Sequence, residues 1–392
     1  MTFEDIKTTE ETYLMHTYGR NQIALEKGQG ATLWDVNGKK YIDLTSGIGV
    51  NSVGHNNEAL VSALHAQAGK LMHASNLFYT APMVEVAKEL VTSTGMGKVF
   101  FANSGAEANE GMIKLARKYS FDKYGEGRNK IITLQMSFHG RTVTTLKATG
   151  QDKFHQYFFP FTEGFDYAKA NDIEDLKSKI DDTTCAVMME MIQGEGGVLP
   201  LDKEFVQAAE AVCKEKDILF LVDEVQTGIG RTGSLFCYEQ YGVQPDIVSM
   251  AKGLGGGVPI GAVLADKKCA DVLGPGTHGT TFGGNPFCCT AAKTVLSIVN
   301  TPEFLKEVQE KGKYLKKEIL AIGSDKIKTV RGMGLMLGIV VDKDERAALV
   351  AKLMEKGILV LTAGTEAIRL LPPLVITYEE MDEALAVMKE VF

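Results

Sequence analysis

The chain has 392 residues, which is too long for one ordinary core and suggests two or three structural units. Hydrophobic residues make up 45% and charged residues 23%, so the composition is that of a folded globular protein and excludes a disordered or fibrous one. Lysine and arginine total 42 against 50 acidic residues, and because the net charge is −8 and no stretch is strongly basic, nucleic acids and anionic membranes are not expected partners.

Local patterns exclude further classes of protein. The opening MTFEDIKTTEET carries acidic residues instead of a basic segment followed by an apolar one, so no secretory signal is expected. The apolar runs are too short to span a bilayer, and the protein is predicted to be cytoplasmic. None of the six cysteines stands in a Cys-x-x-Cys pattern and no two of the seven histidines are four residues apart, so neither disulfides nor a metal site is expected.

The first two-thirds of the chain predict a small sheet followed by a large one. Residues 22–44 alternate apolar positions around Asn37-Gly38, a dipeptide that favours the turn of a tight antiparallel hairpin. From about residue 98, short apolar runs alternate with helical periodicity, which is typical of a parallel sheet. Further strands are expected in runs that are mostly apolar on both faces, as buried parallel strands are: 99–103, 130–135, 185–191, 218–224, 246–252 and 260–265.

The remainder of the chain predicts a smaller unit. After residue 300 we expect a helix, a strand at 334–341, a helix that ends near Gly357, a strand at 358–363 and a last helix, for which Thr377 and Glu380 form a capping box. The predicted fold class is α/β. A large domain, residues 51–298, has a mostly parallel mixed sheet flanked by helices, and a smaller α+β domain is built from both ends of the chain, residues 1–50 and 299–392.

Polar residues follow five of the predicted strands of the large domain. Because ligands bind at the carboxyl ends of the strands in open parallel sheets, these segments are expected to converge on one crevice. The segments are Asn103 to Ala106, Ser137 to Arg141, Gln193 to Glu195, Asp223 to Gln226, and Lys252.

Three of these features together predict a pyridoxal phosphate (PLP) site. Gly105 and Ala106 open a helix whose free amides could hold a phosphate, although such turns often merely start helices. Asp223 ends the apolar run ILFLV, where a carboxylate needs a cationic partner, either an internal salt bridge or a protonated pyridine nitrogen. Lys252, alone, would most simply be a surface lysine. PLP uses a lysine for covalent attachment, an acid beside its ring nitrogen and a phosphate cradle.

Nucleotide sites are less well supported. The glycine-rich stretch at 253–257 does not continue as G-x-G-x-x-G, because position 258 is valine, and the chain has no Walker Gly-Lys-Ser/Thr motif. A protein that binds a nucleotide without PLP on an α/β sheet remains a third alternative.

Longer motifs resemble a known family. The runs LFLVDEVQTGIGRTG, SMAKGLGGGVPIGAV and HGTTFGGNP, in this order, are similar to those of the class III aminotransferases of fold type I, and the similarity extends from about residue 13 to the C-terminus. Within that family the segments SNLFY, NSGAEANE, SFHGRT and QGEGGV are most similar to those of members that act on N-acetylornithine. The family places proline at many counterparts of His16, in a segment that covers the substrate entrance.

The resemblance implies a set of cofactor contacts. Lys252 would carry PLP and transfer protons, and Asp223 would face the ring nitrogen; these two are the implied catalytic residues. Thr281 would reach the phosphate from the partner subunit of a homodimer with shared active sites. The other implied contacts are the phosphate with Gly105 and Ala106, the two ring faces with Phe138 and Val225, and the ring hydroxyl with Gln226. His139 is interpreted as a structural hydrogen-bonding residue.

It also implies a substrate site. Arg141 would bind the carboxylate far from the reacting amine, and Thr280 would lie beside the substrate. Glu195 would neutralise Arg369 while a terminal amine reacts, and release it for the α-carboxylate of 2-oxoglutarate. The implied reaction transfers the terminal amine of N-acetylornithine to 2-oxoglutarate, giving N-acetylglutamate semialdehyde and glutamate, a step of arginine biosynthesis. Ornithine, succinylornithine or 4-aminobutyrate as the amine donor remains the alternative.

Overall fold

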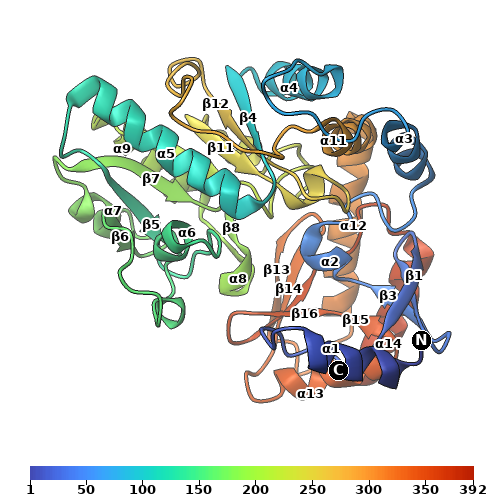
Figure 1. The fold of residues 1–392 in the computed structure, drawn as a ribbon. Coiled ribbons are helices and arrows are strands. Elements are labelled where there is room, and N and C mark those ends of the chain that lie inside the picture. The colour runs from blue at the N-terminus through green and yellow to red at the C-terminus, as the bar shows by residue number, and fades with distance from the viewer.

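The computed structural model describes residues 1–392, and its centre is a seven-stranded sheet (Figure 1). All of its strands are parallel except β12, which is antiparallel to both neighbours. A mostly parallel mixed sheet is thereby confirmed; its one unpredicted strand is β6, which is short and only partly buried. In spatial order the strands are β4 (Lys98–Ala102), β12 (Gly261–Ala265), β11 (Ile247–Met250), β10 (Leu219–Asp223), β7 (Thr184–Met189), β5 (Lys130–Leu134) and β6 (Phe165–Ala168).

Helices cover both faces of this sheet because its central strands are apolar on both sides. Successive side chains of a strand point to opposite faces. In β7, Met188 packs in the cluster that contains Met112 of α5 (Gly105–Tyr124), whereas Met189 packs in the cluster that contains Phe205 of α9 (Lys203–Glu215). Helix α7 (Ile173–Lys179) contacts α9. Figure 1 shows α5 lying across the front of the sheet.

Three further helices pack together beside the β4 edge of the sheet. Helix α11 (Pro286–Val299) packs against α3 (Glu58–Ala68) and α4 (Ala81–Thr94), and α4 contacts β4. The short elements, several of which follow sheet strands, are α6 (Val143–Ala148), η1 (Asp152–Phe154), β8 (Ile192–Gln193), α8 (Gly194–Gly197), β9 (Leu199–Pro200), α10 (Tyr238–Tyr241) and η2 (Lys252–Leu254).

Two four-stranded sheets come from the ends of the chain. The predicted N-terminal antiparallel sheet is β1 (Leu25–Gln29), β2 (Thr32–Asp35) and β3 (Lys40–Asp43), with Gly38 at φ +83° in the turn. β15 (Ile358–Leu359) adds to it, parallel to β3. The second sheet is antiparallel in the order β13 (Thr329–Met333), β14 (Met336–Val340), β17 (Ala367–Leu370) and β16 (Leu361–Ala363).

The prediction of a single strand at 358–363 was wrong. Residues 358–359 pair with β3 and residues 361–363 pair with β17, so the run is shared between the two smaller sheets. Strands β13 and β17 were not predicted. Because β15 joins the N-terminal sheet, both ends of the chain lie together (Figure 1). The domain boundaries at residues 50 and 298 stay predictions.

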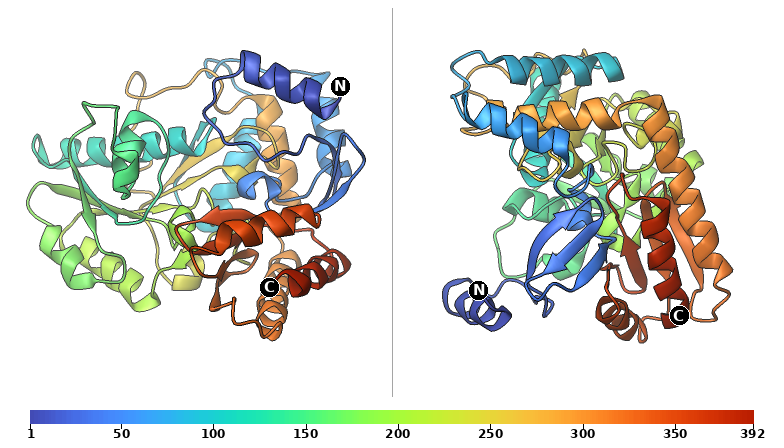
Figure 2. Two further views of the ribbon diagram at one scale, coloured as in Figure 1. Left: turned by 90° about the horizontal axis from the view of Figure 1, so that it is seen from below. Right: turned by 90° about the vertical axis from the view of Figure 1, so that its right-hand side faces the viewer.

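Helices complete this part of the molecule. The last helix, α14 (Tyr378–Val391), has the predicted capping box of Thr377 and Glu380. None of the residues of α1 (Phe3–Tyr13) is buried, and both views in Figure 2 show it on the outside of the molecule. The others are α2 (Ser46–Gly49), α12 (Pro302–Ala321) and α13 (Arg346–Glu355). No helix has both the length and the apolar character needed to cross a membrane.

A buried arginine connects the large sheet to both chain ends. The guanidinium of Arg231 donates hydrogen bonds to the carbonyl oxygens of Leu335 at 2.9 Å and Pro372 at 2.5 Å, and to the hydroxyl of Ser46 at 3.4 Å. Burial lowers the pKa of Arg231 to about 9. Arg231 forms no ion pair, so these oxygens, together with the nearby charge of Asp43, compensate its desolvation, and the hydrogen bonds connect the three segments.

Candidate active site

A cavity of about 450 Å³ opens at the carboxyl ends of the central strands. It is lined by residues that follow five strands, β4, β5, β7, β10 and β11, as the sequence predicted. After β7 the lining residue is Glu190 and not the predicted Gln193 to Glu195. The cavity thus gathers the residues expected to bind the cofactor: Gly105, Ala106, Phe138, Asp223, Val225, Gln226 and Lys252.

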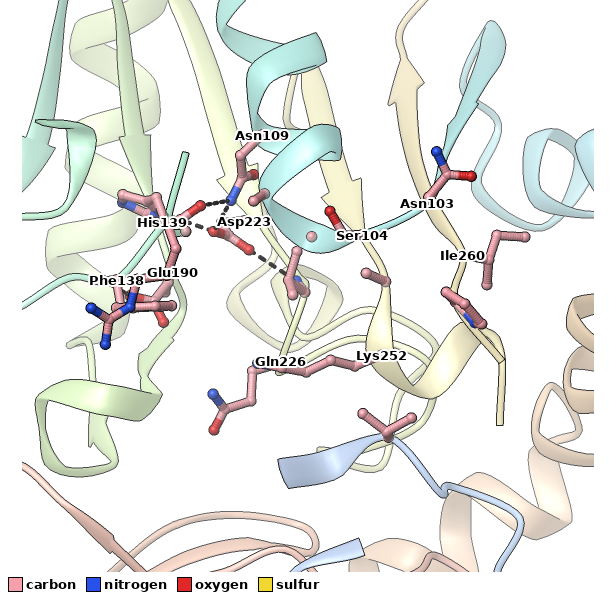
Figure 3. A pocket seen from close by; sticks show the side chains of 18 of the residues that line it. Asn103, Ser104, Asn109, Phe138, His139, Glu190, Asp223, Gln226, Lys252 and Ile260 are labelled. Carbon is pink, nitrogen blue, oxygen red and sulfur yellow. Dashed lines mark hydrogen bonds and ion pairs between the residues drawn. The ribbon is translucent and has the colours of Figure 1, made fainter. Parts of the chain in front are cut away.

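Asp223 is held in one orientation by three donors. It ends β10 and is 3% exposed. Its Oδ2 accepts hydrogen bonds from Asn109 Nδ2 at 2.7 Å and His139 Nδ1 at 2.8 Å, and its Oδ1 accepts one from the Val225 amide at 2.9 Å. Figure 3 shows Asn109 and His139 pointing toward Asp223. These donors fix the orientation of the Asp223 carboxyl group at the floor of the cavity.

His139 is therefore a hydrogen-bonding partner of Asp223. A carboxylate only accepts, so the proton of the imidazole is on Nδ1. Its Nε2 is buried and has no partner. This arrangement orients the acid.

Asn109 is a site residue that the sequence analysis missed. Its Nδ2 also donates to the His139 carbonyl at 2.7 Å, and its Oδ1 accepts from the Ser249 hydroxyl at 2.6 Å. It thereby links α5 to β10 and β11 beneath the cavity. The available signal was its position one helical turn after Gly105, because residues four apart share a helix face.

The start of α5 offers free amides to the cavity. The N-cap hydroxyl of Ser104 accepts from the Glu107 amide at 3.2 Å, which leaves the amides of Gly105 and Ala106 without a partner inside the helix. A Cβ atom at Gly105 would lie 2.6 Å from Val225 Cγ1, so only glycine allows this approach. The geometry suits an anion, which the helix dipole also favours.

Lys252 stands two residues after Met250, the last residue of β11, and its side chain forms no ion pair or hydrogen bond. Its φ of +40° is a left-handed conformation that non-glycine residues seldom adopt, and such strain is concentrated at functional sites. Burial lowers the pKa of its amine, while the charge of Glu195 opposes this shift. Lys252 therefore loses its proton more readily than an exposed lysine does. The uncharged amine is the form that attacks a carbonyl carbon.

The predicted pair of Glu195 and Arg369 is formed. Arg369, in β17, is 3% exposed, and its Nη1 donates to Glu195 Oε1 at 2.6 Å and to Gln226 Oε1 at 3.1 Å. Because a guanidinium only donates, the amide oxygen of Gln226 must face Arg369 and its NH₂ group is left for other partners. Gln226 also lines the cavity, so the pair lies next to the space predicted for the PLP ring.

Arg141 differs from Arg369 in having no carboxylate partner. It is exposed at the cavity, and its Cζ lies 4.3 Å from the ring centroid of Phe154 and 5.6 Å from that of Phe138. The aromatic rings hold the guanidinium without neutralising it. It is therefore available to an incoming carboxylate.

Thr280 and Thr281 do not line the cavity of their own chain. Thr281 is exposed. The Thr280 hydroxyl accepts hydrogen bonds from Asn103 Nδ2 at 3.2 Å and from the Gly283 amide at 3.1 Å. Their expected roles, which for Thr281 depend on a second subunit, stay predictions.

Glu190 was also missed. It is 4% exposed, it lines the cavity, and burial raises its pKa to about 7. The signal that singled out Asp223, a carboxylate directly after a buried apolar run, is present here too, because Glu190 follows β7.

Comparison with known proteins agrees with this geometry. The family model of the class III aminotransferases matches residues 13–392, and the chain belongs to this family. It is 50% identical to the acetylornithine aminotransferase of Haemophilus ducreyi over 100% of this chain and 99% of that one.

Solved structures show the same fold. The ornithine aminotransferase of Toxoplasma gondii superposes with a TM-score of 0.96 at 33% identity, covering 100% of this chain and 95% of that one. In another structure of that enzyme, PLP partially occupies the active site. The N-acetylornithine aminotransferase of Stenotrophomonas maltophilia superposes with a TM-score of 0.85 at 38% identity, covering 98% and 97% of the two chains.

Proposed function

We propose that this protein is a PLP-dependent transaminase that transfers the terminal amine of N-acetylornithine to 2-oxoglutarate, giving N-acetylglutamate semialdehyde and glutamate in arginine biosynthesis. The observation that carries the proposal is one cavity lined by a lysine, an oriented carboxyl group and an arginine without a carboxylate partner, with a second arginine, paired with Glu195, next to it behind Gln226. The family and the acetylornithine aminotransferase of Haemophilus ducreyi support the same reaction. We place the reaction in the cytoplasm on the sequence pattern given above.

The residues present fit PLP. The free amides of Gly105 and Ala106 would hold its phosphate, and Phe138 and Val225 would cover the two faces of its ring. Asp223, oriented by its three donors, would face the ring nitrogen and keep it protonated. When bound, PLP supplies the electron sink that lets a proton leave the substrate carbon.

Lys252 would do the proton transfers. Its Nζ is the one amine of the cavity, and no carboxylate engages it in an ion pair. A side chain that would first bind the cofactor and then be set free could take the proton from the amine-bearing substrate carbon and deliver it to the cofactor. The lowered pKa of Lys252 suits it to accept that proton.

The two arginines would divide the substrates between them. Arg141 would bind the carboxylate far from the reacting amine of N-acetylornithine, using its forked donors. The reacting carbon of this substrate has no carboxylate, so Arg369 stays with Glu195 in the first half-reaction. In the second half-reaction the α-carboxylate of 2-oxoglutarate would bind Arg369, and Glu195, which is 30% exposed, would move aside.

The surroundings of Arg141 favour an acylated substrate over free ornithine. A free α-ammonium beside Arg141 would need a carboxylate, and none forms an ion pair with this arginine. The acidic residues that line the cavity, Glu190 and Asp223, already accept backbone or side-chain hydrogen bonds. An N-acetyl group carries no charge and avoids this cost.

The test is a comparison of amine donors with 2-oxoglutarate as acceptor: N-acetylornithine, N-succinylornithine, ornithine and 4-aminobutyrate. We expect the highest kcat/KM with N-acetylornithine and a lower value with ornithine. A higher value with ornithine or 4-aminobutyrate would overturn the substrate assignment while leaving the transaminase class intact. A colourless protein without bound PLP that binds a nucleotide would overturn the class.

A homodimer with shared sites is part of the proposal. Leu77, Phe78 and Tyr79 are 86%, 67% and 99% exposed, which is unusual for large apolar side chains of a monomer. The neighbouring Asn76 donates to the carbonyl oxygens of Thr280 and Gly283, so this apolar surface adjoins the loop of Thr281. A second copy covering it would bring Thr281 to its partner's cavity.

Mixed dimers test the sharing of sites. In a hybrid of a Lys252→Ala protomer and a Thr281→Ala protomer, one site would combine an intact lysine with an intact threonine from the other chain. We expect activity above that of either variant alone after unfolding and refolding the mixture. No recovery, although the hybrid forms, would show that each site is complete within one chain.

A further inference from the structure

Glu190 is a buried acid of the cavity to which the mechanism above gives no role. It directly follows β7, is 4% exposed and forms no ion pair with any lysine, arginine or histidine. A buried carboxylate without a cation needs hydrogen-bond donors to offset its desolvation. Which donors it uses therefore indicates what it holds in place.

Its two oxygens hold two different loops. Oε1 accepts from the amide of Phe138 at 2.8 Å, and Oε2 accepts from the amide of Gly194 at 3.3 Å. Phe138 belongs to the loop that carries Arg141, and Gly194 directly precedes Glu195. One carboxylate thus connects the loop that binds the distant carboxylate of the substrate with the turn that neutralises Arg369.

The turn at Gly194 has little freedom of its own. A Cβ atom at Gly194 would lie 2.4 Å from Gln226 Oε1, so this backbone packs directly on the other partner of Arg369. A small displacement of the turn would disturb both acceptors of the Arg369 guanidinium. The Gly194 amide itself is held by its hydrogen bond to Glu190.

We propose that Glu190 is a positioning residue for the Glu195–Arg369 pair: by holding the Gly194 amide it keeps Glu195 against Arg369 when no α-carboxylate is bound. The inference rests on the proposed function, because the pair has a role only in an enzyme that alternates between two kinds of substrate. In this role Glu190 acts through the Gly194 amide and Glu195.

Glu190→Gln tests this role without changing side-chain size. An amide has one accepting oxygen, so one of the two backbone N–H groups must face the NH₂ group. The shorter contact, to Phe138, should keep the oxygen, and Gly194 should lose its acceptor. We expect the ratio of the two half-reaction rates to move toward glutamate by roughly 3- to 10-fold, in the direction expected for Glu195→Ala but less far.

Glu224→Gln is the matched control. Glu224 is 1% exposed and directly follows the neighbouring strand β10, and burial raises its pKa to about 7 as well. It accepts from the Tyr238 amide at 2.8 Å and from the Thr227 hydroxyl, and it does not line the cavity. Both variants should unfold at lower temperature, but only Glu190→Gln should change the ratio. An equal shift in Glu224→Gln would overturn the proposal.

A double mutant shows whether Glu190 acts through Glu195. Starting from Glu195→Ala, the added change Glu190→Gln should leave the half-reaction ratio where Glu195→Ala put it, because the group being positioned is gone. A further shift of the same size would mean that Glu190 acts independently. If Glu190→Gln does not fold, Glu190→Asp replaces it, since the shorter side chain cannot reach both amides, and the same ratio shift is expected.

Hydrogen exchange of the cofactor-free protein gives a readout without catalysis. In Glu190→Gln the peptide that contains the Gly194 amide should exchange roughly 10-fold faster, and the peptide with the Phe138 amide should not. Unchanged exchange and an unchanged ratio in an active enzyme would overturn the positioning role alone. If the wild-type protein does not transaminate at all, the proposed function fails, and the exchange result then reports only on the Glu190 contact.

Discussion

The two halves of the site are built differently. The acid proposed to face the cofactor, Asp223, is 3% exposed and takes its three donors from segments of the seven-stranded sheet and its covering helix. The Glu195–Arg369 pair joins two sheets: Glu195 follows β8 and Arg369 lies in β17, and the glutamate is 30% exposed. We therefore expect the first arrangement to stay closed and the second to open when a substrate carboxylate binds.

We infer from this difference that the Asp223 cluster serves both half-reactions and that the Glu195–Arg369 pair serves only one. Changes to the Asp223 cluster or to Lys252 should slow both half-reactions alike. Changes to the residues that meet substrate carboxylates should slow one and spare the other. The following experiments break or sharpen that comparison.

Lys252→Ala should have the largest effect. Removing the amine removes both the covalent anchor and the proton-transfer group, so we expect steady-state transamination to fall at least about 10⁴-fold with either substrate pair. The measurement is multiple turnover with N-acetylornithine and 2-oxoglutarate at saturating PLP. Sustained turnover at more than a trace of the wild-type rate would refute the assignment of Lys252.

Asp223→Asn should slow both half-reactions by roughly 100-fold, since a neutral amide cannot keep the ring nitrogen protonated. Asparagine has nearly the same shape but only one accepting oxygen, so it can keep either the contacts with Asn109 and His139 or the contact with the Val225 amide. Single-turnover rates of each half-reaction at saturating PLP measure this. A variant that only binds PLP more weakly, with normal rates once saturated, would contradict the role.

Arg141→Ala should act on one substrate. Losing a charge-assisted contact to the distant carboxylate should lower kcat/KM for N-acetylornithine by roughly 10- to 100-fold, mostly through KM, because ground and transition states use the contact equally. 1-Pentylamine, which has no such carboxylate, serves as the control donor and should react at an unchanged rate. An equal loss with both amines would show that Arg141 is structural.

A smaller effect concerns pH and stability. Burial raises the pKa of Glu224 to about 7, so between its unfolded value and pH 7 the folded protein keeps a proton that the unfolded chain has lost, and the free energy of unfolding falls as pH rises. Glu224→Gln lacks this proton. From pH 5 to 8, wild type should lose roughly 1–3 kcal/mol of stability relative to the variant. Parallel curves in denaturant unfolding would contradict the buried-acid interpretation.

Most of the cofactor side could be predicted from the sequence. Apolar runs locate the strands, and the rule that ligands bind at their carboxyl ends places Asp223, Lys252 and Gly105 together. Asn109 and Glu190 were missed although similar signals exist for them, because their importance lies in contacts with His139, Phe138 and Gly194 that only the folded chain brings together.

The substrate side was less accessible. β17 has four residues with Arg369 among them, so its pattern does not predict a strand, and the Glu195–Arg369 pair was expected only from the family resemblance. Residues 358–363 read as one strand because periodicity does not tell which sheet a residue joins. The role of Thr281 depends on a second chain and so lies beyond what one cavity can show.

The most direct test of the contrast between the two halves is Glu195→Ala in single-turnover experiments. In the proposed mechanism, Glu195 balances the buried Arg369 while the terminal amine reacts, and glutamate or 2-oxoglutarate must displace it. Without Glu195, the ratio of the two half-reaction rates should move roughly 10- to 100-fold in favour of glutamate. If both half-reactions slow by the same factor, or if N-acetylornithine is unaffected, Glu195 is only a structural acid and the division between the two halves is wrong.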